Sequence, residues 1–457
     1  MREVAFRLAG APAKGRAARL VIENQSEEVV RNFWIRRADQ PSFYSATTLL
    51  DSVTAGLPTE CDKALALWGL FPAYYRNHFP PTDTGAAIDP GTVLAIFGAG
   101  QCNYAVDTLA TLCQMAGLRT RQIGLEVDAS DGSRMAHCVM EVLADGRWIY
   151  LDPDRAAAYR RADGEWASLE DLRAHPEVVE AAGHPQVAEA LRRGLVVIQA
   201  EHPDPRRLAR MQIDPSRYQK YRHMMRYDLL PGQRFVFRLD EHNGPHYTET
   251  PGAGPPPTYC PGSALVRFEG LTLGRLRSAA LWVNVKEAPS AALATAPDVL
   301  MLTPIEPDQP AWLALPMVSP YLMTAASVRV EGLPLPAGSV QILLFRRAPT
   351  LPDEWMPLNR RAGPYERTLV DLFRAQPAFG FALRVRVPPG GLRLTRLQLR
   401  AHVQASLPAL PVAWDGNDEL RIYCEDATRF LAQPGKIFPG HSATFDNGVR
   451  IMCEPAE

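Results

Sequence analysis

The sequence changes its pattern near residue 228, and this change limits the fold more than any other feature of the 457-residue chain. Before it, residues 166–227 are charged and have helical spacing, as in "SLEDLRAHPEVVEAAG". After it, short alternating segments such as "ALVRFEG", "ASVRVEG" and "GFALRVRV" follow one another between Gly and Pro turns. Regular short strands with turn signals predict an all-β domain over residues 229–457, which we expect to be a β-sandwich that can bind substrate.

The first half of the chain mixes strand and helix patterns. Residues 3–8 and 17–23 alternate and carry β-branched side chains, so residues 1–40 are predicted as an N-terminal β segment. Residues 41–228 are predicted as one α+β domain. Its main elements are expected as helices at 43–55, 60–78 and 102–116 and as strands at 118–127, 136–143 and 147–152, with a hairpin turn at 144–147.

The charge balance argues against two classes of partner. The chain has 50 acidic and 49 basic residues and a net charge of −1, so no overall field attracts nucleic acid or anionic lipid. No run of about 18 apolar residues predicts a membrane span, and the N-terminus lacks the apolar core of a signal peptide. We expect no nucleic-acid partner, no membrane partner and a cytoplasmic location, or a periplasmic or secreted one if the natural chain begins earlier.

The seven cysteines are scattered and form no CxxC pair, which argues against a zinc site or a disulfide framework. We expect reduced thiols, no metal and no cofactor. Cys102 differs from the others because it follows the turn "GAGQ" and begins a helical pattern. The positive end of a helix dipole lowers a thiol pKa there, and the free backbone N–H can stabilise an oxyanion. These are the needs of a nucleophile, although Cys102 taken alone could be a small core residue.

A thiol nucleophile needs a base and a group that orients the base. His137 lies at the start of one expected strand, and Asp152 ends the next. The hairpin turn places residue 137 opposite residue 154, two positions from Asp152, so the imidazole and the carboxylate can meet diagonally on one face. Singly, His137 could be a core histidine and Asp152 a turn residue before Pro153; together with Cys102 they predict a triad.

Four segments carry a resemblance to a known family. They are "GQC" at 100–102, "AGLRTR" at 116–121, "HCVME" at 137–141 and "GRWIYLDP" at 146–153. In this order and spacing they resemble the bacterial transglutaminase-like superfamily, a relative of the papain-type thiol enzymes. The resemblance covers roughly residues 60–160 and implies a papain/transglutaminase-like core, in which a helix packs on an antiparallel sheet. It also implies that Cys102 is the nucleophile, His137 the base and Asp152 the orienting group.

The implied chemistry is amide or peptide hydrolysis or acyl transfer through a thioester on Cys102. Two departures favour hydrolysis over cross-linking. Asn103 stands where transglutaminases usually carry Trp, and their upstream Trp has no clear counterpart. Residues 164–172 and 229–234 also look like a bacterial branch of the family that is found beside polysaccharide-degradation genes.

Two other functions stay open. The same scaffold can serve a glycan hydrolase or lyase, with carboxylates acting and Cys102 as a bystander, and the Trp-, Tyr- and Arg-rich β domain would then grip a sugar chain. The chain can also be a non-catalytic module that binds glycan or peptide, which the intact triad argues against. The expected substrate is therefore a peptide or amide, or a polysaccharide. The candidate acids for glycan cleavage are Asp107, Glu126, Asp128, Glu141 and Asp154.

Substrate-binding residues are expected in two places. Gln101, Asn103 and Tyr104 flank the nucleophile, and the Gln101 side chain is a candidate for the second oxyanion donor. The segment "DEHNGPHY" at 240–247 gathers imidazole and aromatic side chains on an expected loop. Its candidate residues are His242, His246 and Tyr247.

Overall fold

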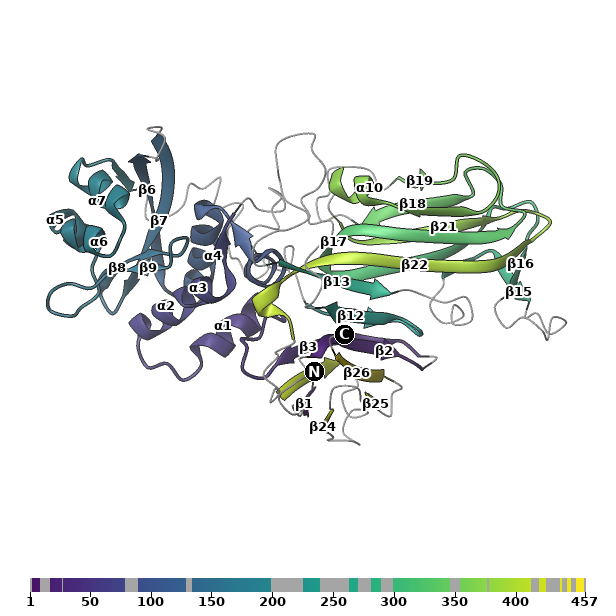
Figure 1. The fold of residues 1–457 in the computed structure, drawn as a ribbon, viewed down its shortest axis with the longest axis horizontal. Coiled ribbons are helices and arrows are strands. Elements are labelled where there is room, and N and C mark those ends of the chain that lie inside the picture. Colours follow the sequence, from purple (N-terminus) through teal and green to yellow (C-terminus); the bar gives the residue numbers. More distant parts are fainter. Residues whose placement is uncertain are drawn as a thin grey trace.

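The computed structural model has an α+β region beside a large region of β-strands (Figure 1). The residues that the structure describes are 2–8, 17–26, 28–78, 89–128, 134–198, 225–238, 263–269, 281–288, 299–345, 354–375, 378–411, 419–424, 436–437, 442–444 and 449–455.

The α+β region runs from the first helix to the tenth strand, and the α+β class expected for it is confirmed. The expected helix at 60–78 is divided at Gly69 into two helices and a short strand. The elements are α1 (Ala46–Thr54), α2 (Glu60–Trp68), α3 (Leu70–Tyr74), β4 (Arg76–Asn77), the π-helix η2 (Thr92–Phe97), β5 (Ala99–Gly100), α4 (Cys102–Met115), β6 (Arg119–Asp128), β7 (Arg134–Ala144), β8 (Arg147–Asp152), β9 (Ala157–Ala158), α5 (Leu169–Ala174), α6 (Glu177–Ala181), α7 (Pro185–Arg192) and β10 (Val196–Ile198).

Local sequence signals explain where these elements begin and end. The Thr59 side chain caps α2 by accepting a hydrogen bond from the Asp62 amide. Gly117, with φ of +82°, takes the left-handed conformation that follows the end of α4. Asp145 and Gly146 also have positive φ, at 51° and 78°, which is the geometry of a two-residue hairpin turn between β7 and β8.

The sheet of this region has the strand order β10-β6-β7-β8-β9, and its pairs are antiparallel. Helices α2 and α4 pack on one face, and α5 and α7 pack on the other. Because successive residues of a strand point to opposite faces, Met140 and Val142 join the core with α4, whereas Val139 joins the core with α5–α7. Two covered faces make the sheet a rigid platform for the side chains at its ends.

The all-β class expected for the second half is confirmed, and the strand pairs of this region are almost entirely antiparallel. They form a large curled sheet of 14 strands and a smaller sheet of five strands (Figure 1). The two longest strands of the large sheet, β17 and β22, pair along most of their length. The strands of this region are β11 (Tyr227–Leu229), β12 (Arg234–Arg238), β13 (Ser263–Glu269), β14 (Leu281–Val283), β15 (Val285–Ala288), β16 (Leu300–Pro304), β17 (Ala311–Leu333), β18 (Val340–Phe345), β19 (Met356–Pro357), β20 (Tyr365–Thr368), β21 (Ala378–Val387), β22 (Leu392–Ser406), β23 (Glu419–Cys424), β24 (Lys436–Ile437), β25 (Ser442–Thr444) and β26 (Val449–Pro455), with the short helices α10 (Val370–Ala375) and η5 (Leu407–Ala409).

The N-terminal strands are β1 (Arg2–Leu8), β2 (Ala17–Asn24) and β3 (Val30–Arg37). They pair with strands from the far end of the chain. Strand β2 lies between β12 and β26, and β1 and β3 lie on either side of β23. The two ends of the chain therefore meet in the β region, so the segment expected at residues 1–40 belongs structurally with the strands of the C-terminal half.

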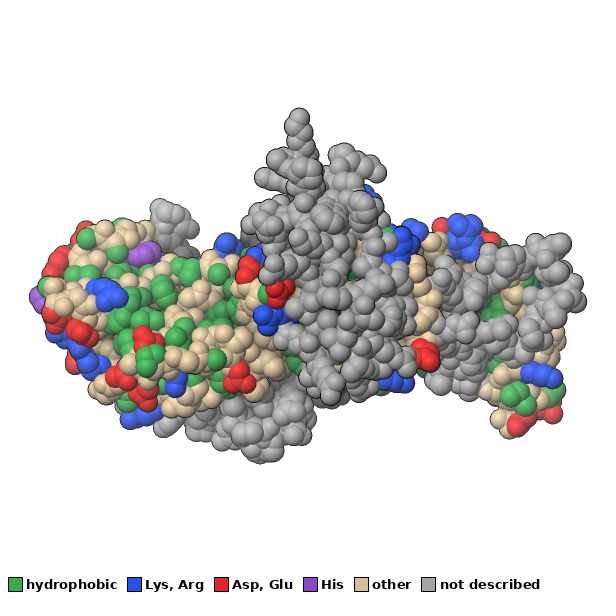
Figure 2. Space-filling model, turned by 90° about the horizontal axis from the view of Figure 1, so that it is seen from below, with side chains coloured by type: hydrophobic (Ala, Val, Ile, Leu, Met, Phe, Trp, Pro, Cys, Tyr) green, Lys and Arg blue, Asp and Glu red, His purple; other side chains and the backbone are tan. Residues whose placement is uncertain are grey.

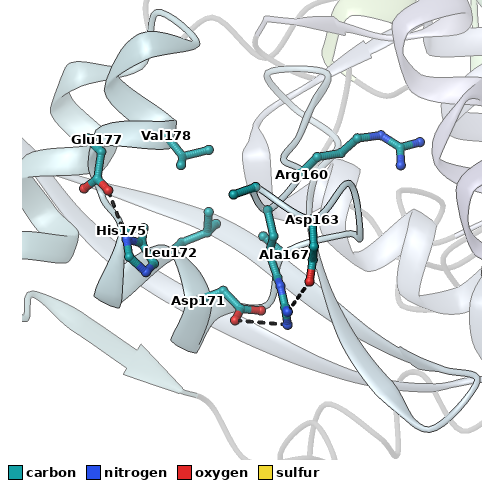
Figure 3. A pocket seen from close by; sticks show the side chains of 10 residues that line it. Arg160, Asp163, Ala167, Asp171, Leu172, His175, Glu177 and Val178 are labelled. Atoms are coloured by element: carbon teal, nitrogen blue, oxygen red, sulfur yellow. Dashed lines mark hydrogen bonds and ion pairs between the residues drawn. The ribbon is translucent and has the colours of Figure 1, made fainter.

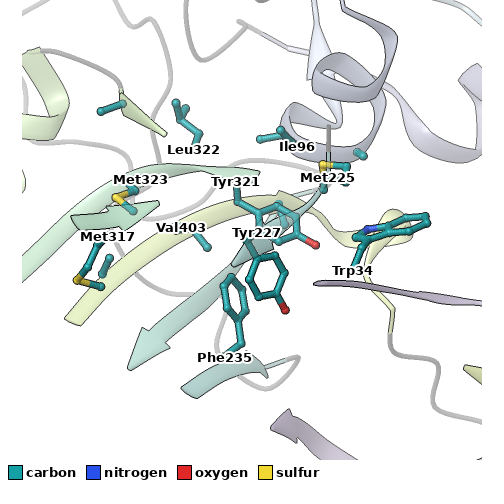
Figure 4. Packing of buried hydrophobic residues seen from close by; sticks show 14 of the residues in the cluster. Trp34, Ile96, Met225, Tyr227, Phe235, Met317, Tyr321, Leu322, Met323 and Val403 are labelled. Carbon is teal, nitrogen blue, oxygen red and sulfur yellow. The ribbon is translucent and has the colours of Figure 1, made fainter. Parts of the chain in front are cut away.

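Buried apolar side chains form one continuous core from the α4 face of the small sheet into the β region. Figure 4 shows the join, where Ile96 of η2 lies near Tyr321 of β17 and Tyr227 of β11. The Tyr227 and Phe235 rings are 4.7 Å apart between centroids, and burial of such rings provides much of the packing energy. This packing holds the segment that leads to Cys102 against the β region.

The described surface mixes charges of both signs. On the face in Figure 2, acidic and basic side chains alternate over the helical end of the molecule. Among the described residues, no helix is long and apolar enough to cross a membrane.

Candidate active site

A crowded turn brings the chain to Cys102. Strand β4 pairs in parallel with β5, and the His78 amide donates to the Gly100 carbonyl at 2.9 Å. The Tyr75 hydroxyl donates to the Gln101 carbonyl at 2.7 Å. A Cβ at Gly100 would overlap that hydroxyl and lie 3.0 Å from the Tyr104 Cβ. Glycine at position 100, two residues before Cys102, is therefore required by space rather than by φ.

Cys102 is the first residue of α4 and is half-buried. The Gln101 carbonyl accepts from the Tyr104 and Ala105 amides, which fixes the first turn of the helix. The amides of Cys102 and Asn103 precede the first intrahelical bonds, and they point toward the N-terminal end of the helix dipole. A carbonyl oxygen bound beside the sulfur would meet these donors, as an oxyanion hole requires.

His137 and Asp152 are brought together by the β7–β8 hairpin. The hairpin pairs Met140 with Leu151, so Asp152 lies two positions from the residue opposite His137. The His137 Nε2 to Asp152 Oδ2 distance is 2.7 Å, and the side chains are 6% and 1% exposed. A buried carboxylate at this distance fixes the orientation of the ring and stabilises its cationic form.

Asp152 is itself held from two more directions. The Arg155 amide donates to its Oδ1 at 3.0 Å. The Trp68 indole Nε1 of α2 donates to its backbone carbonyl at 3.4 Å. The carboxylate therefore has one oxygen for the backbone and one for His137.

The sulfur and the imidazole shift each other's pKa in opposite directions. Hydrogen bonding from the Cys138 thiol lowers the pKa of Cys102, burial opposes this, and hydrogen bonding from His137 lowers it further, to about 4. Burial lowers the pKa of His137, but the hydrogen bonds to Asp152 and Cys102 outweigh it and raise that pKa to about 9. Between these values the pair is a thiolate and an imidazolium, which is the reactive state of a thiol enzyme.

A second carboxylate lies beside the triad. Asp154 Oδ2 accepts from the Asn77 side-chain amide at 2.7 Å. Burial first, and then the charges of Asp152 and Cys102, raise the pKa of Asp154 to about 6, although His137 and the Asn77 hydrogen bond lower it. The charge of this candidate acid for glycan cleavage therefore acts on all three triad residues.

The other candidate acids have different surroundings. Asp107 accepts from the Gln122 side chain. Glu141 is fully buried and accepts from Arg121 at 2.6 Å and from the Leu169 amide at 2.6 Å, so it ties α5 to the sheet. Glu126 is exposed on β6, and the side chain of Asp128 lies outside the described residues.

The candidate substrate-binding residues near Cys102 differ in exposure. Gln101 is exposed, and its side chain does not cap α4. Asn103 and Tyr104 are half-buried in the first turn of α4. The other three candidates, in the segment at 240–247, lie outside the described residues: His242, His246 and Tyr247.

Four side chains near the triad were not singled out by the sequence analysis. Trp68, Tyr75 and Asn77 come from α2 to β4, and Cys138 follows His137 directly. The signal for Cys138 was adjacency to the base in "HCVME". For the other three no local signal exists: the contacts of Tyr75 and Asn77 depend on the path of β4 beside β5, and that of Trp68 joins α2 to the end of β8.

A separate hollow of about 450 Å³ lies on the α5–α7 side of the sheet. Asp163 and Asp171 both form ion pairs with Arg161. Figure 3 shows Asp163 and Asp171 on one side of the hollow, and the hydrogen bond between His175 and Glu177 on the other. None of the triad residues lines it. Among the described residues, no cluster of His, Cys, Asp and Glu could hold a metal ion.

Comparison with known proteins identifies one family. Residues 47–153 match the model of the transglutaminase-like superfamily. A comparison with curated protein sequences finds no match.

Two solved structures are similar only distantly. Chitosan-binding module 1 from a chitosanase/glucanase of Paenibacillus sp. IK-5 is 17% identical, with a TM-score of 0.18, over 26% of this chain and 92% of that one. The infectious bursal disease virus VP2 subviral particle is 9% identical, with a TM-score of 0.17, over 67% of this chain and 76% of that one. These scores are too low to support any conclusion about this chain.

The matched range contains α2, the nucleophile turn, α4 and the β6–β8 sheet with Cys102, His137 and Asp152. Residues 47–153 of this chain are therefore a transglutaminase-like superfamily domain.

Proposed function

We propose that the protein is a thiol enzyme that cleaves or transfers amide-linked acyl groups through a thioester on Cys102. The observation that carries the proposal is the buried 2.7 Å contact of Asp152 with His137. The His137 ring in turn forms a hydrogen bond with the sulfur of Cys102 at the start of α4. A glycan hydrolase needs no such sulfur–imidazole pair.

The first half of the reaction forms the thioester. The Cys102 thiolate adds to the carbonyl carbon, and the carbonyl π electrons move to the oxygen as an oxyanion beside the first-turn amides of α4. When the oxyanion collapses, the carbon–nitrogen bond breaks. The leaving amine takes its proton from the His137 imidazolium, which becomes neutral.

The second half restores the enzyme. Neutral His137 takes a proton from water, and the resulting hydroxide adds to the thioester carbonyl. Collapse of this adduct releases the carboxylic acid product, with Cys102 again a thiolate and His137 again an imidazolium. A primary amine in place of water gives acyl transfer with the same proton balance; we propose hydrolysis as the main outcome, because Asn103 replaces the Trp that usually follows the nucleophile.

The test compares wild type with Cys102→Ala on a panel of peptides that contain carboxamides and on a panel of polysaccharides, with products read by mass. Loss of the nucleophile is expected to reduce amide cleavage by about 10⁴-fold or more while thermal unfolding is unchanged. Cys61→Ser is the matched control, because Cys61 is also half-buried but burial, followed by the Asp145 charge, raises its thiol pKa.

A second measurement does not need the substrate. Iodoacetamide should label Cys102 rapidly near neutral pH, and His137→Ala should slow this labelling because the imidazolium no longer stabilises the thiolate. Full activity of Cys102→Ala on a polysaccharide would replace the proposal with glycan cleavage. If neither panel yields product and labelling is as slow as for an ordinary thiol, the domain is not an enzyme of this kind.

A further inference from the structure

The hydrogen bond between Asn77 and Asp154 joins two parts of the site that are distant in the sequence. Asn77 lies on β4, and β4 pairs with the Gly100 segment that leads directly to Cys102. Asp154 lies two residues after Asp152, in the turn that follows β8. The 2.7 Å hydrogen bond between their side chains therefore connects β4, which pairs with the segment before Cys102, to the turn that directly follows Asp152.

The Asp154 carboxylate is only partly compensated. Oδ2 has its partner in Asn77, but Oδ1 is buried and has no hydrogen-bond partner among the described residues. Its charge acts on Cys102 and His137, and also on the buried Tyr75 ring, whose pKa is raised first by burial and then by Asp154. A carboxylate that lacks full compensation in a desolvated place acts strongly on its neighbours.

We propose that Asp154, held by Asn77, is a positioning residue of the thiol chemistry. It fixes the turn before Cys102 relative to His137 and Asp152, and its negative charge makes the thiolate more nucleophilic. This inference rests on the proposed function. A purely structural link would hold the turn in place, whereas the charge of Asp154 also changes the reactivity of the sulfur.

Charged and polar groups face Asp154 from two parts of the site. These are Cys102, His137 and Asp152 of the triad, and Asn77 and Tyr75 from the β4 side; Arg155, the next residue in the chain, acts on His137. A carboxylate near a thiolate raises the thiol pKa, and a more basic thiolate is a better nucleophile, by about threefold for each pKa unit. Because the pKa of Cys102 is about 4, the sulfur stays ionised near neutral pH in spite of this increase.

The Asp154 carboxylate makes the reactivity of the sulfur depend on pH. The pKa of Asp154 is about 6, so its carboxylate is ionised above this value and protonated below it. As pH falls through about 6, the sulfur loses a negative neighbour, becomes less basic and reacts more slowly, although it is still a thiolate. The alkylation rate should therefore show a step near pH 6, above the larger loss near pH 4 where the thiolate itself is protonated.

The experiment measures the second-order rate of iodoacetamide alkylation of Cys102 between about pH 4 and pH 9 in the full chain. Wild type should slow by about two- to threefold as pH falls through about 6. Asp154→Asn keeps a side chain that can bond to Asn77 but removes the charge, so the step should disappear and the rate near pH 7.5 should fall by about two- to threefold.

A second variant, Asn77→Ala, keeps the charge of Asp154 but removes the hydrogen bond that holds it. Asn77→Ala removes the hydrogen bond that lowers the pKa of Asp154, so the step should remain but move to higher pH. Asn77 is exposed, so folding should not be affected, and a decrease in kcat with little change in KM for the amide substrate would report the looser nucleophile turn. Asp163→Asn is the control and should change neither step nor rate, because Asp163 is an exposed carboxylate that lines the separate hollow, which none of the triad residues lines.

The outcomes distinguish this inference from the function on which it rests. If Cys102 reacts as a thiolate but Asp154→Asn keeps the step near pH 6, or Asn77→Ala leaves it in place, the role of Asp154 is wrong and the thiol chemistry stands. If the wild-type rate simply rises through pH 8 to 9 as for an ordinary thiol, the proposed function fails first.

Discussion

The two sheets differ in how far apart in the sequence their neighbouring strands lie. In the α+β region, β6, β7 and β8 pair in the order in which they occur. In the β region, β2 lies between β12 and β26, and β13 pairs with β22, so partners are separated by more than 100 residues. Short connections close at low entropic cost and fix register locally. The sheet that carries the triad is thus the one whose register the chain sets locally.

The two regions also differ in what they bury. Among the described residues, the buried Asp, Glu and His side chains all lie in the α+β region: Asp89, His137, Glu141 and Asp152. In the β region the buried polar side chains are neutral, such as Gln404 and Ser406. Buried charge is costly unless it is paired, and it concentrates where chemistry needs shifted pKa values. The difference supports the proposal that the α+β region carries the reaction while the β region stabilises the molecule.

The largest expected effect concerns stability alone. Phe381 of β21 is fully buried, and its ring packs edge-on against Phe373 at 5.9 Å. Phe381→Ala should lower the free energy of unfolding by about 3–5 kcal/mol, because it removes buried ring surface and leaves a cavity. Denaturant unfolding measures the loss, and iodoacetamide labelling of Cys102 in the folded variant should keep its rate and pH profile.

The matched control for this substitution is Val318→Ala on β17, where the side chain is 51% exposed. It should change stability by less than about 0.5 kcal/mol. If Phe381→Ala altered the pH profile of labelling instead, the division between a stabilising region and a reactive region would be wrong.

The next effect concerns the turn before the nucleophile. Gly100→Ala places a Cβ against the Tyr75 hydroxyl and should move Cys102 relative to His137. A shift of the nucleophile costs about tenfold or more in kcat. Adding Tyr75→Phe removes the obstructing oxygen, so the double variant should recover part of the rate despite the lost bond to the Gln101 carbonyl.

Tyr75→Phe alone is the reference for this pair, since it loses the hydrogen bond without the added methyl group. If the decreases in kcat of Gly100→Ala and Tyr75→Phe simply multiply in the double variant, the two substitutions act independently. The added methyl group and the Tyr75 hydroxyl would then not compete for the same space.

The features that could be predicted from the sequence are those set by neighbours in the chain. The end of α4 before Gly117 and the hairpin at Asp145 each have a local cause in turn geometry, and the start of α4 at Cys102 follows from the helical pattern that begins after the "GAGQ" turn. The hairpin turn also sets the register between β7 and β8, and this register brings His137 diagonally opposite Asp152. The contact between the two side chains could therefore be predicted from the position of the turn.

The features that could not be predicted depend on contacts between distant segments. Strand β4 has only two residues, too few for a pattern, yet it sets where Asn77 lies. The place of the N-terminal strands beside β23 and β26 likewise depends on tertiary packing, because alternation predicts a strand and not its partner. These long-range contacts position Asp154 and Tyr75 and are absent from any local pattern.

The smallest expected effect concerns the Cys138 thiol and its influence on the pKa of Cys102 within the α+β region. The Cys138 thiol is the largest influence that lowers the pKa of Cys102, and it comes from the residue next to the base. Cys138→Ala removes this donor while the backbone amide of residue 138 still bonds the sulfur, so the pKa of Cys102 should rise by about one unit. Labelling near pH 7.5 should change little, because the thiolate still dominates, whereas labelling near pH 4.5 should fall by about threefold or more. Cys138→Ser, which restores a donor, should recover most of the loss at low pH; an unchanged profile in both variants would leave His137 and the helix N-terminus as sufficient causes of the low pKa.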